Sequence, residues 1–440
     1  MTNKILLILV MLLTAIGFSQ EQKTEFTLQE AIDYALENNR QANNATRDIE
    51  AAKQQKWETI ATGLPQINGN ISYTNNIKQQ FPGIDFNGDN IVDFGAKQNI
   101  TPSATLNQLL FDGSYLVGLQ SAKVFLEISK NAKIKTDLEI RKAVINTYGN
   151  VLLAEESIKI LERNIAVLEK NLNETSRIYE NGLGEEESVE QLKITLSSIK
   201  SNLNKIERLK AIAYQMFNIT LGIEINTKTV LTDALETLTL KNISLATLEA
   251  DVNVENTIDY QIAENEKVSK ELLVKLEQSR ALPTLSGFLT GSYIGNNDNF
   301  RFLNNNQAWA GTAAFGLNLD IPIFGSGLKS AKTQRAKINL ESAEDNLTET
   351  EQKIKLQIAT AKNNYQFAIE DYQNKKENLA LAERIEKKNQ TKFFEGIGSS
   401  FELRQAQTQL YTTQNELLKA MVDIINTKAE LETVLNITNN

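Results

Sequence analysis

Apolar residues recur at alternating intervals of three and four along several stretches of the chain. The longest run joins ten positions from Leu403 to Val434, and shorter runs extend from Val189 to Ile206, Ile158 to Leu172 and Ile354 to Tyr372. This seven-residue period predicts α-helices that pack against one another as left-handed coiled coils. We call each such row of apolar positions a seam. Outside the seams the helices are rich in Lys, Glu, Asn and Gln, which predicts contact with water on more than one side.

A second pattern alternates apolar residues with small or polar ones in short segments. It is clearest between Trp309 and Ile323, within a predicted strand near 308–323, and it is weaker near 66–74, 100–110 and 284–294. A period of two with one apolar face is typical of barrel strands that face lipid. A water-soluble antiparallel sheet with one buried face is the alternative.

The chain contains two copies of one unit. Three landmarks recur in the same order at separations of 218, 213 and 214 residues: Leu64-Pro65 with Leu282-Pro283, the segments 110–113 and 323–327, and the segments 179–184 and 393–398. Such a long period indicates a duplicated module and not a solenoid. We therefore expect a first repeat over 20–221, a linker over 222–255 and a second repeat over 256–440.

Each repeat shows the same internal order. A helix near 27–63 or 256–281 comes first, and two strands follow. A long helix near 113–180 or 327–394 is then joined by a glycine turn to a last helix near 186–220 or 399–436. A helix of 68 residues spans roughly 100 Å at 1.5 Å per residue. Helices this long and this polar predict the wall of a water-filled tube.

The predicted fold class is an α+β membrane protein with four strands per chain. Four strands cannot close a membrane barrel, and an open sheet edge is not tolerated in lipid. The barrel must therefore be shared between copies of the chain. The strand arithmetic allows a dimer or a trimer.

The N-terminus resembles an export signal. Lys4 precedes an apolar run from Ile5 to Ile16, and Gly17 and Ser19 suit a cleavage site after residue 19. A buried helix of the mature fold is the alternative. No later stretch approaches the ~18 apolar residues of a membrane helix. We expect a signal peptide over 1–19 and a periplasmic, secreted or outer-membrane protein.

The composition removes several kinds of chemistry. The chain has no cysteine and no histidine, which excludes disulfides, a lipidated cysteine, most catalytic triads and most zinc sites. Its net charge of -9 argues against nucleic-acid binding, which needs a basic surface. The acidic residues are spread over solvated helix faces without a pocket or phosphate-loop motif. We expect no enzyme activity and no cofactor, although carboxylate chemistry alone is not excluded.

The order of these landmarks resembles that of the TolC family of outer-membrane efflux proteins. The segment Phe26–Asn39 also looks like the start of that family, and the resemblance covers essentially the whole mature chain. It implies a homotrimer with a 12-stranded barrel and a 12-helix periplasmic tunnel. It also implies an exit duct for tripartite efflux or type I secretion, served by an inner-membrane pump and a periplasmic adaptor. A coiled-coil scaffold without a pore is the alternative function.

The same resemblance implies a gate where the last helix of the second repeat begins. Glu402 and Gln405 fall on the two positions that form the family's carboxylate ring, so the second carboxylate is missing. Phe393 replaces a tyrosine, and Gly398 stands where the family has a latch arginine. A helix-start glutamate favoured by the helix dipole is the competing interpretation of Glu402.

The glycine turns are a second candidate site. Gly182, Gly184, Gly396 and Gly398 follow the two long helices, and ending a helix in a tight turn requires positive φ. The family's adaptors dock at these tips, so the four glycines are candidate contact positions. The acidic run Glu185–Glu187 beside the first turn either adds to the field of the pore or is simply solvated.

One loop carries an incomplete calcium pattern. Asp85, Asn87, Asp89 and Asp93 supply oxygen ligands at positions 1, 3, 5 and 9 of a calcium loop. The expected glycine and glutamate of that loop are replaced by Asn90 and Ala96. An acidic polar loop without metal is the alternative.

Overall fold

The computed structural model describes residues 24–77, 96–249 and 253–437. The predicted signal peptide and all four candidate calcium ligands lie outside these residues. The chain divides into two compact units. Unit 1 is drawn from Met1–Thr46, Ala132–Gln261 and Glu351–Asn440, and unit 2 from Arg47–Asn131 and Ile262–Thr350. Each unit takes segments from both repeats, so the compact units follow a different division from the duplication.

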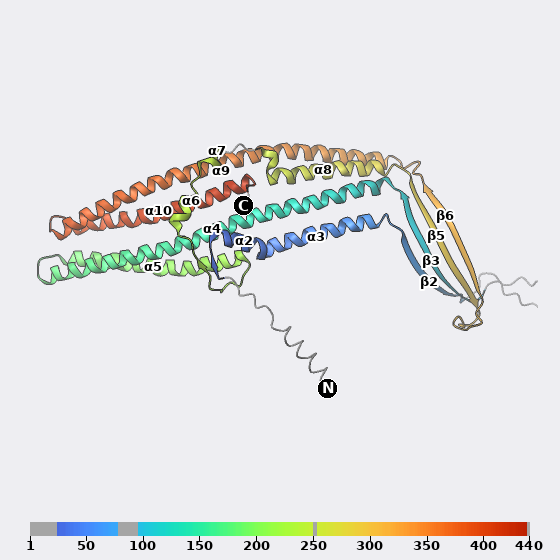
Figure 1. The fold of residues 1–440 in the computed structure, drawn as a ribbon, viewed down its shortest axis with the longest axis horizontal. Helices are drawn as coiled ribbons and strands as arrows, with labels where there is room; N and C mark the ends of the chain where they lie inside the picture. The colour runs from blue at the N-terminus through green and yellow to red at the C-terminus, as the bar shows by residue number, and fades with distance from the viewer. Residues whose placement is uncertain (1–23, 78–95, 250–252, 438–440) are drawn as a thin grey trace, which may run out of the picture. The chain divides into compact units, whose positions relative to one another are not determined.

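Unit 2 contains a four-stranded antiparallel sheet (Figure 1). Its strands are β2 (Gln66–Asn75), β3 (Gln98–Phe111), β5 (Thr284–Asn297) and β6 (Trp309–Asp320), in the order β2-β3-β5-β6. Each repeat contributes one hairpin, and β3 of the first repeat pairs with β5 of the second. Among the residues that the structure describes, no strand pairs with the outer edge of β2 or of β6.

Four helices have residues in unit 2: α3 (Arg40–Ala61), α4 (Gly113–Glu180), α8 (Ile258–Ser279) and α9 (Leu328–Phe394). Asp112 begins α4, because its Oδ1 accepts hydrogen bonds from the backbone N–H groups of Ser114 and Tyr115 at 2.7 and 3.3 Å. The Tyr115 ring lies directly over Gly63, where an added Cβ would come within 2.3 Å of it. Glycine at position 63 therefore lets the end of α3 approach the start of α4.

Unit 1 packs helices around a large apolar core. It includes α2 (Leu28–Asn38), α5 (Glu186–Leu221), α10 (Ser400–Val434) and parts of α4 and α9. Phe26, Tyr148 and Phe217 are fully buried at its centre, and the Phe217 ring contacts those of Tyr148 and Phe26 edge to face, with centroids 5.8 and 6.3 Å away. Large aromatic side chains contribute much of the buried apolar area of such a core.

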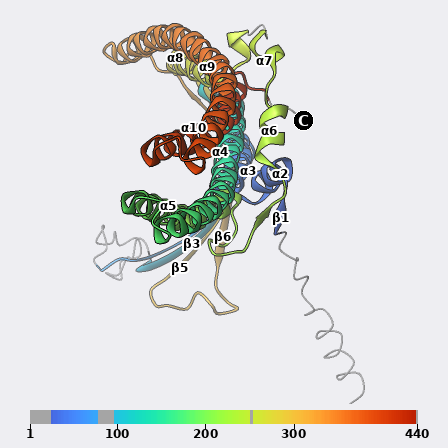
Figure 2. The same ribbon diagram turned by 90° about the vertical axis from the view of Figure 1, so that its left-hand side faces the viewer.

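The linker between the repeats forms its own elements. It contains β4 (Val230–Leu231), α6 (Leu235–Lys241), α7 (Leu245–Glu249) and the short 3-10 helix η1 (Val254–Asn256). A two-residue strand, β1 (Glu25–Phe26), pairs in parallel with β4. Figure 2 shows β1, α2, α6 and α7 together on one side of the long helices. The sequence patterns did not predict these elements, because each is too short to show a period.

The first helix differs from the expectation of one continuous helix over 27–63. It is interrupted at Asn39, whose ψ of 136° ends α2. The Asn39 side chain donates to the carbonyl of Thr220 at 2.7 Å and accepts from the N–H of Gln41 at 2.7 Å. One residue thus ends α2, caps α3 and joins both to the end of α5.

The buried positions of α4 and α5 include part of the predicted seams. Ile165 and Leu168 of α4 form a cluster with Leu192 and Leu196 of α5. The described residues are mostly helical with one principal sheet, which confirms the α+β class. No helix in the described ranges combines the length and apolar character needed to cross a bilayer.

Candidate functional site

The sheet has two chemically different faces. Ile67, Leu106, Leu289 and Phe315 lie opposite one another on neighbouring strands and form an apolar row across one face. Ile67 and Phe315 are 72% and 74% exposed. On the other face the Thr105 and Thr290 hydroxyls lie 2.9 Å apart, as part of a surface of hydroxyl and amide side chains. An apolar face beside a polar face suits a sheet between lipid and water.

The composition of the strands and the residues at their ends also suit a sheet in a membrane. Asp320, at the end of β6, is the only charged residue in the four strands. Tyr73, Tyr293 and Trp309 lie toward the loop-connected ends on the apolar face, and aromatic residues in this position are typical of a membrane interface. The Tyr73 ring also contacts Phe300 edge to face at 5.8 Å.

The two helical hairpins of unit 1, α4–α5 and α9–α10, have turns of the same type. Gly182 and Gly396 have φ of 72° and 78°, in the left-handed region that glycine adopts without strain. The N–H of Gly182 donates to Tyr179 O at 2.8 Å, and the N–H of the next residue, Leu183, donates to Ile178 O at 3.0 Å. The bonds of Gly396 and Ile397 repeat this pattern 214 residues later. Both turns are therefore Schellman motifs.

The expectation of positive φ was wrong for Gly184 and Gly398, which lie outside the left-handed region. Their constraint is steric: an added Cβ would come within 3.0 Å of the Ile178 side chain at Gly184 and 2.9 Å of Lys392 at Gly398. The residue between the glycines is instead the prominent feature of each tip. Leu183 is 82% exposed and Ile397 is 72% exposed.

The three predicted gate residues lie near the turn of the α9–α10 hairpin. Ser399 and Glu402 form a capping box: the Glu402 N–H donates to Ser399 Oγ at 3.2 Å, and Glu402 Oε2 accepts from the Ser399 N–H at 3.3 Å. This agrees with the helix-start interpretation of Glu402. Phe393 packs edge to face on Phe394 at 5.3 Å, and Gln405 is exposed. The protomer thus gives Glu402 a structural role and leaves Gln405 open to solvent.

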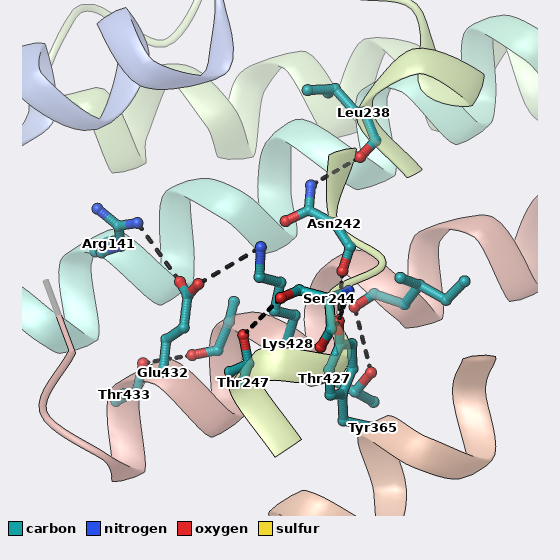
Figure 3. A network of polar contacts seen from close by, with 12 residues as sticks. Arg141, Leu238, Asn242, Ser244, Thr247, Tyr365, Thr427, Lys428, Glu432 and Thr433 are labelled. Atoms are coloured by element: carbon teal, nitrogen blue, oxygen red, sulfur yellow. Dashed lines mark hydrogen bonds and ion pairs between the residues drawn. The ribbon is translucent and has the colours of Figure 1, made fainter. Parts of the chain in front are cut away.

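A polar network fastens the linker to the long helices (Figure 3). The Tyr365 hydroxyl of α9 donates to Asn242 O at 2.5 Å and accepts from the Ser244 N–H at 2.8 Å. Burial raises the pKa of Tyr365, so the phenol keeps its proton as donor. Beside it, Glu432 of α10 lies 3.5 Å from Arg141 of α4 and 3.7 Å from Lys428. Tyr365 lies within the apolar spacing from Ile354 to Tyr372, which does not predict this second role.

A second polar contact joins the N-terminal segment to the linker. Asp233 Oδ2 accepts from the Leu28 N–H at 2.7 Å and lies 2.9 Å from the Tyr148 hydroxyl. Burial raises the pKa of Tyr148, and its hydrogen bond to Asp233 raises it further. The carboxylate therefore accepts from the first backbone N–H of α2 across 205 residues of sequence, beside the local capping box of Thr27 and Glu30. Nothing in the local pattern around Asp233 predicts this contact.

A bound metal ion needs several ligating side chains that lie close together. In residues 24–77, 96–249 and 253–437, no three His, Cys, Asp or Glu side chains lie close enough together to hold a metal ion. The calcium pattern of the loop containing Asp85 lies outside these residues and stays a prediction.

A chain with a two-faced four-stranded sheet and two long helical hairpins has the features expected of an outer-membrane channel protomer. The family model described as outer membrane efflux protein matches residues 261–436. Residues 261–436 of the chain thus carry an outer membrane efflux protein domain.

The similarity to known proteins extends beyond the matched segment. The chain is 21% identical over 401 residues to outer membrane protein TolC of Vibrio cholerae, covering 90% of this chain and 88% of that protein. Its fold matches a crystal structure of CusC with a TM-score of 0.77 at 19% identity, covering 93% of this chain and 91% of the other. It also matches VceC of Vibrio cholerae with a TM-score of 0.74 at 16% identity, covering 93% and 96%.

Proposed function

We propose that three copies of this chain form a passive exit duct through the outer membrane and periplasm. The duct serves a tripartite efflux or type I secretion system, in which an inner-membrane pump supplies the driving force. The observation that carries this proposal is the two-faced sheet with two unpaired edges. A coiled-coil scaffold without a pore accounts for the helical seams but not for this sheet.

The edges of the sheet require further copies of the chain. Backbone N–H and C=O groups in lipid must be satisfied within the protein, so β2 and β6 need partner strands. Joining β6 of one copy to β2 of the next satisfies both edges. Three copies give 3 × 4 = 12 strands, the number expected from the family resemblance. The apolar row then faces lipid, and the hydroxyl and amide face lines the pore.

The helices of unit 1 expose apolar surface that suits the same assembly. Leu209, Ile212, Met216 and Ile219 follow a 3-4-3 spacing on α5, and each is about half exposed in the protomer. On α9, Phe367, Leu381 and Ile385 are similarly exposed. An exposed heptad seam is stabilised by a second helix. We propose that α5 of one copy packs against α9 of the next and closes the tunnel.

The hairpin tips form the periplasmic entrance in this proposal. Phe393, Glu402 and Gln405 line the constriction, with one carboxylate per copy in the ring. The turns containing Gly182, Gly184, Gly396 and Gly398 contact the adaptor, and the exposed Leu183 and Ile397 offer it apolar anchors. A partner helix that covers such side chains gains their burial energy.

Planar-bilayer recording tests the conduit. The purified full chain should require detergent and should give single channels in lipid. A compact, water-soluble monomer without conductance would refute the proposal.

Cysteine cross-linking tests the assembly, because the natural chain has no cysteine that could react. The paired variant Ile212→Cys with Phe367→Cys places the two cysteines 29 and 30 residues from their hairpin tips and should give covalent trimers on oxidation. Each single variant is the control and should stay monomeric on a denaturing gel. A covalent ladder that ends at two copies would indicate a dimer.

A further inference from the structure

An aromatic ring interrupts the hydroxyl and amide groups on the polar face of the sheet. Phe288 of β5 lies directly opposite Gly316 of β6 and in the same cross-strand row as Asn107 of β3. The next row on this face contains Thr105 and Thr290, whose hydroxyls are 2.9 Å apart. The ring therefore belongs to the face that lines the pore in the proposed duct.

The glycine opposite Phe288 gives the ring its position. A Cβ added at Gly316 would come within 2.5 Å of the Cε1 and Cζ atoms of Phe288. The outer edge of the ring thus occupies the space that a side chain at position 316 would fill. Because this space lies against the backbone of β6, the ring lies along the wall of the sheet and does not extend away from it. Phe288 is accordingly half-buried.

The apolar face of the same hairpin contains a similar pair. Tyr293 lies opposite Gly311, where an added Cβ would come within 3.0 Å of the ring. Such pairs stabilise a sheet, because the aromatic ring covers backbone that glycine leaves exposed. The pair on the polar face differs in its surroundings. Its ring borders water instead of lipid, so the side of the ring that points away from the sheet is open to a solute in the pore.

The one charged residue of the four strands lies on the same face as this ring. Asp320 pairs with Thr284 and follows Gly316 by four residues, so both are on the same side of β6. The carboxylate lies roughly 13 Å along the strand from the ring, at about 3.3 Å per residue. The four strands contain no Lys or Arg that would repel a cation. An aromatic face and a carboxylate both attract cations.

We propose that the Phe288 ring is a binding platform in the pore for organic cations that have an apolar or aromatic body. Such a cargo stacks on the open side of the ring, and the Asp320 carboxylates of the assembly raise its concentration nearby. Gly316 lets the ring lie flat, which keeps the passage beside it wide. This inference rests on the proposed function, because the polar face lines a pore only in the assembled duct.

Block of single channels by tetraphenylphosphonium tests the platform. A cation–π contact at a partly exposed ring corresponds to roughly a two- to fivefold change in affinity. Phe288→Leu should therefore raise the apparent dissociation constant for block at least about twofold. Tetraphenylborate, an anion of similar shape, is the control, and its block should be the same in Phe288→Leu and the wild type. Equal block of the two proteins by tetraphenylphosphonium would overturn the proposal.

The aromatic–glycine pair on the apolar face supplies a matched control variant. Tyr293→Leu removes a ring that also lies over a glycine of β6, but from the side that does not line the pore. Tetraphenylphosphonium should block Tyr293→Leu as strongly as it blocks the wild type. An equal loss of block in Tyr293→Leu and Phe288→Leu would assign the effect to the stability of the sheet and overturn the platform.

Two further variants keep the test decisive if Phe288→Leu does not assemble. A methyl group in Gly316→Ala displaces the ring from the wall, so this variant should also weaken block by tetraphenylphosphonium. Where Phe288→Leu does assemble, adding Gly316→Ala to it should cause no further loss, because the ring is already absent. Asp320→Asn should weaken block at low salt, and this loss should shrink as salt screens the carboxylate. Block that neither Gly316→Ala nor Asp320→Asn changes would overturn the platform.

Equilibrium dialysis separates this inference from the proposed function. The detergent-solubilised full chain should retain more tetraphenylphosphonium than detergent alone, and Phe288→Leu should retain less than the wild type. A chain that never conducts but shows this difference refutes the duct and leaves the binding site. A chain that conducts, with the same block and the same retention in Phe288→Leu as in the wild type, refutes only the platform.

Discussion

Replacing Tyr365 by Phe removes one hydroxyl and keeps the buried ring. That hydroxyl is the contact through which α9 holds both Asn242 O and the Ser244 N–H of the linker. A neutral hydrogen bond contributes about 0.5–1.5 kcal/mol, and an unpaired buried group costs about 1–3 kcal/mol. Asn242 and Ser244 are only half-buried, so water can form part of the hydrogen bonding that their backbone groups lose. We therefore expect a total cost of about 2 kcal/mol, or roughly a 30-fold increase in local opening.

Hydrogen exchange measured by mass spectrometry on the solubilised full chain reports this opening. Peptides that cover α6 and α7 should exchange roughly 30-fold faster in Tyr365→Phe than in the wild type, while peptides from the sheet should be unchanged. Tyr372→Phe is the matched control, because Tyr372 is buried on the same helix seven residues later. No hydrogen bond from the Tyr372 hydroxyl to another described residue is seen in the structure. If the two variants raise exchange in α6 and α7 equally, the ring and not the hydroxyl holds the linker.

Three further predictions test other parts of the molecule. Gly396→Ala should destabilise the hairpin by about 1–2 kcal/mol, because alanine pays for a left-handed φ, and chemical denaturation checks this. Phe315→Lys should reduce insertion into lipid vesicles at a cost of about 2–4 kcal/mol, while Thr312→Lys on the polar face should insert normally; equal insertion would contradict the assignment of the faces. Burial raises the pKa of Asp423, so the stability of the wild type relative to Asp423→Asn should fall as pH rises through the folded pKa. Melting curves at several pH values measure this difference, and a rising difference would show the reverse sign.

The sequence alone determined those features that depend on a local period or a local turn. Heptad spacing identified the long helices, and α4 extends over Gly113–Glu180, the range that the pattern indicated. Alternation located the strands, with β6 at Trp309–Asp320 inside the expected 308–323. The repeated glycine turns marked the two hairpin tips. These features can be predicted from the sequence because residues close together in the chain determine which face of a helix or strand is apolar and where the chain turns.

The tertiary structure decided every feature that depends on residues distant in sequence. Thr220 holds the break at Asn39, Asp233 binds the first backbone N–H of α2, and Tyr365 docks the linker. None of these contacts follows a period, because each joins a side chain to a backbone group more than 100 residues away in sequence.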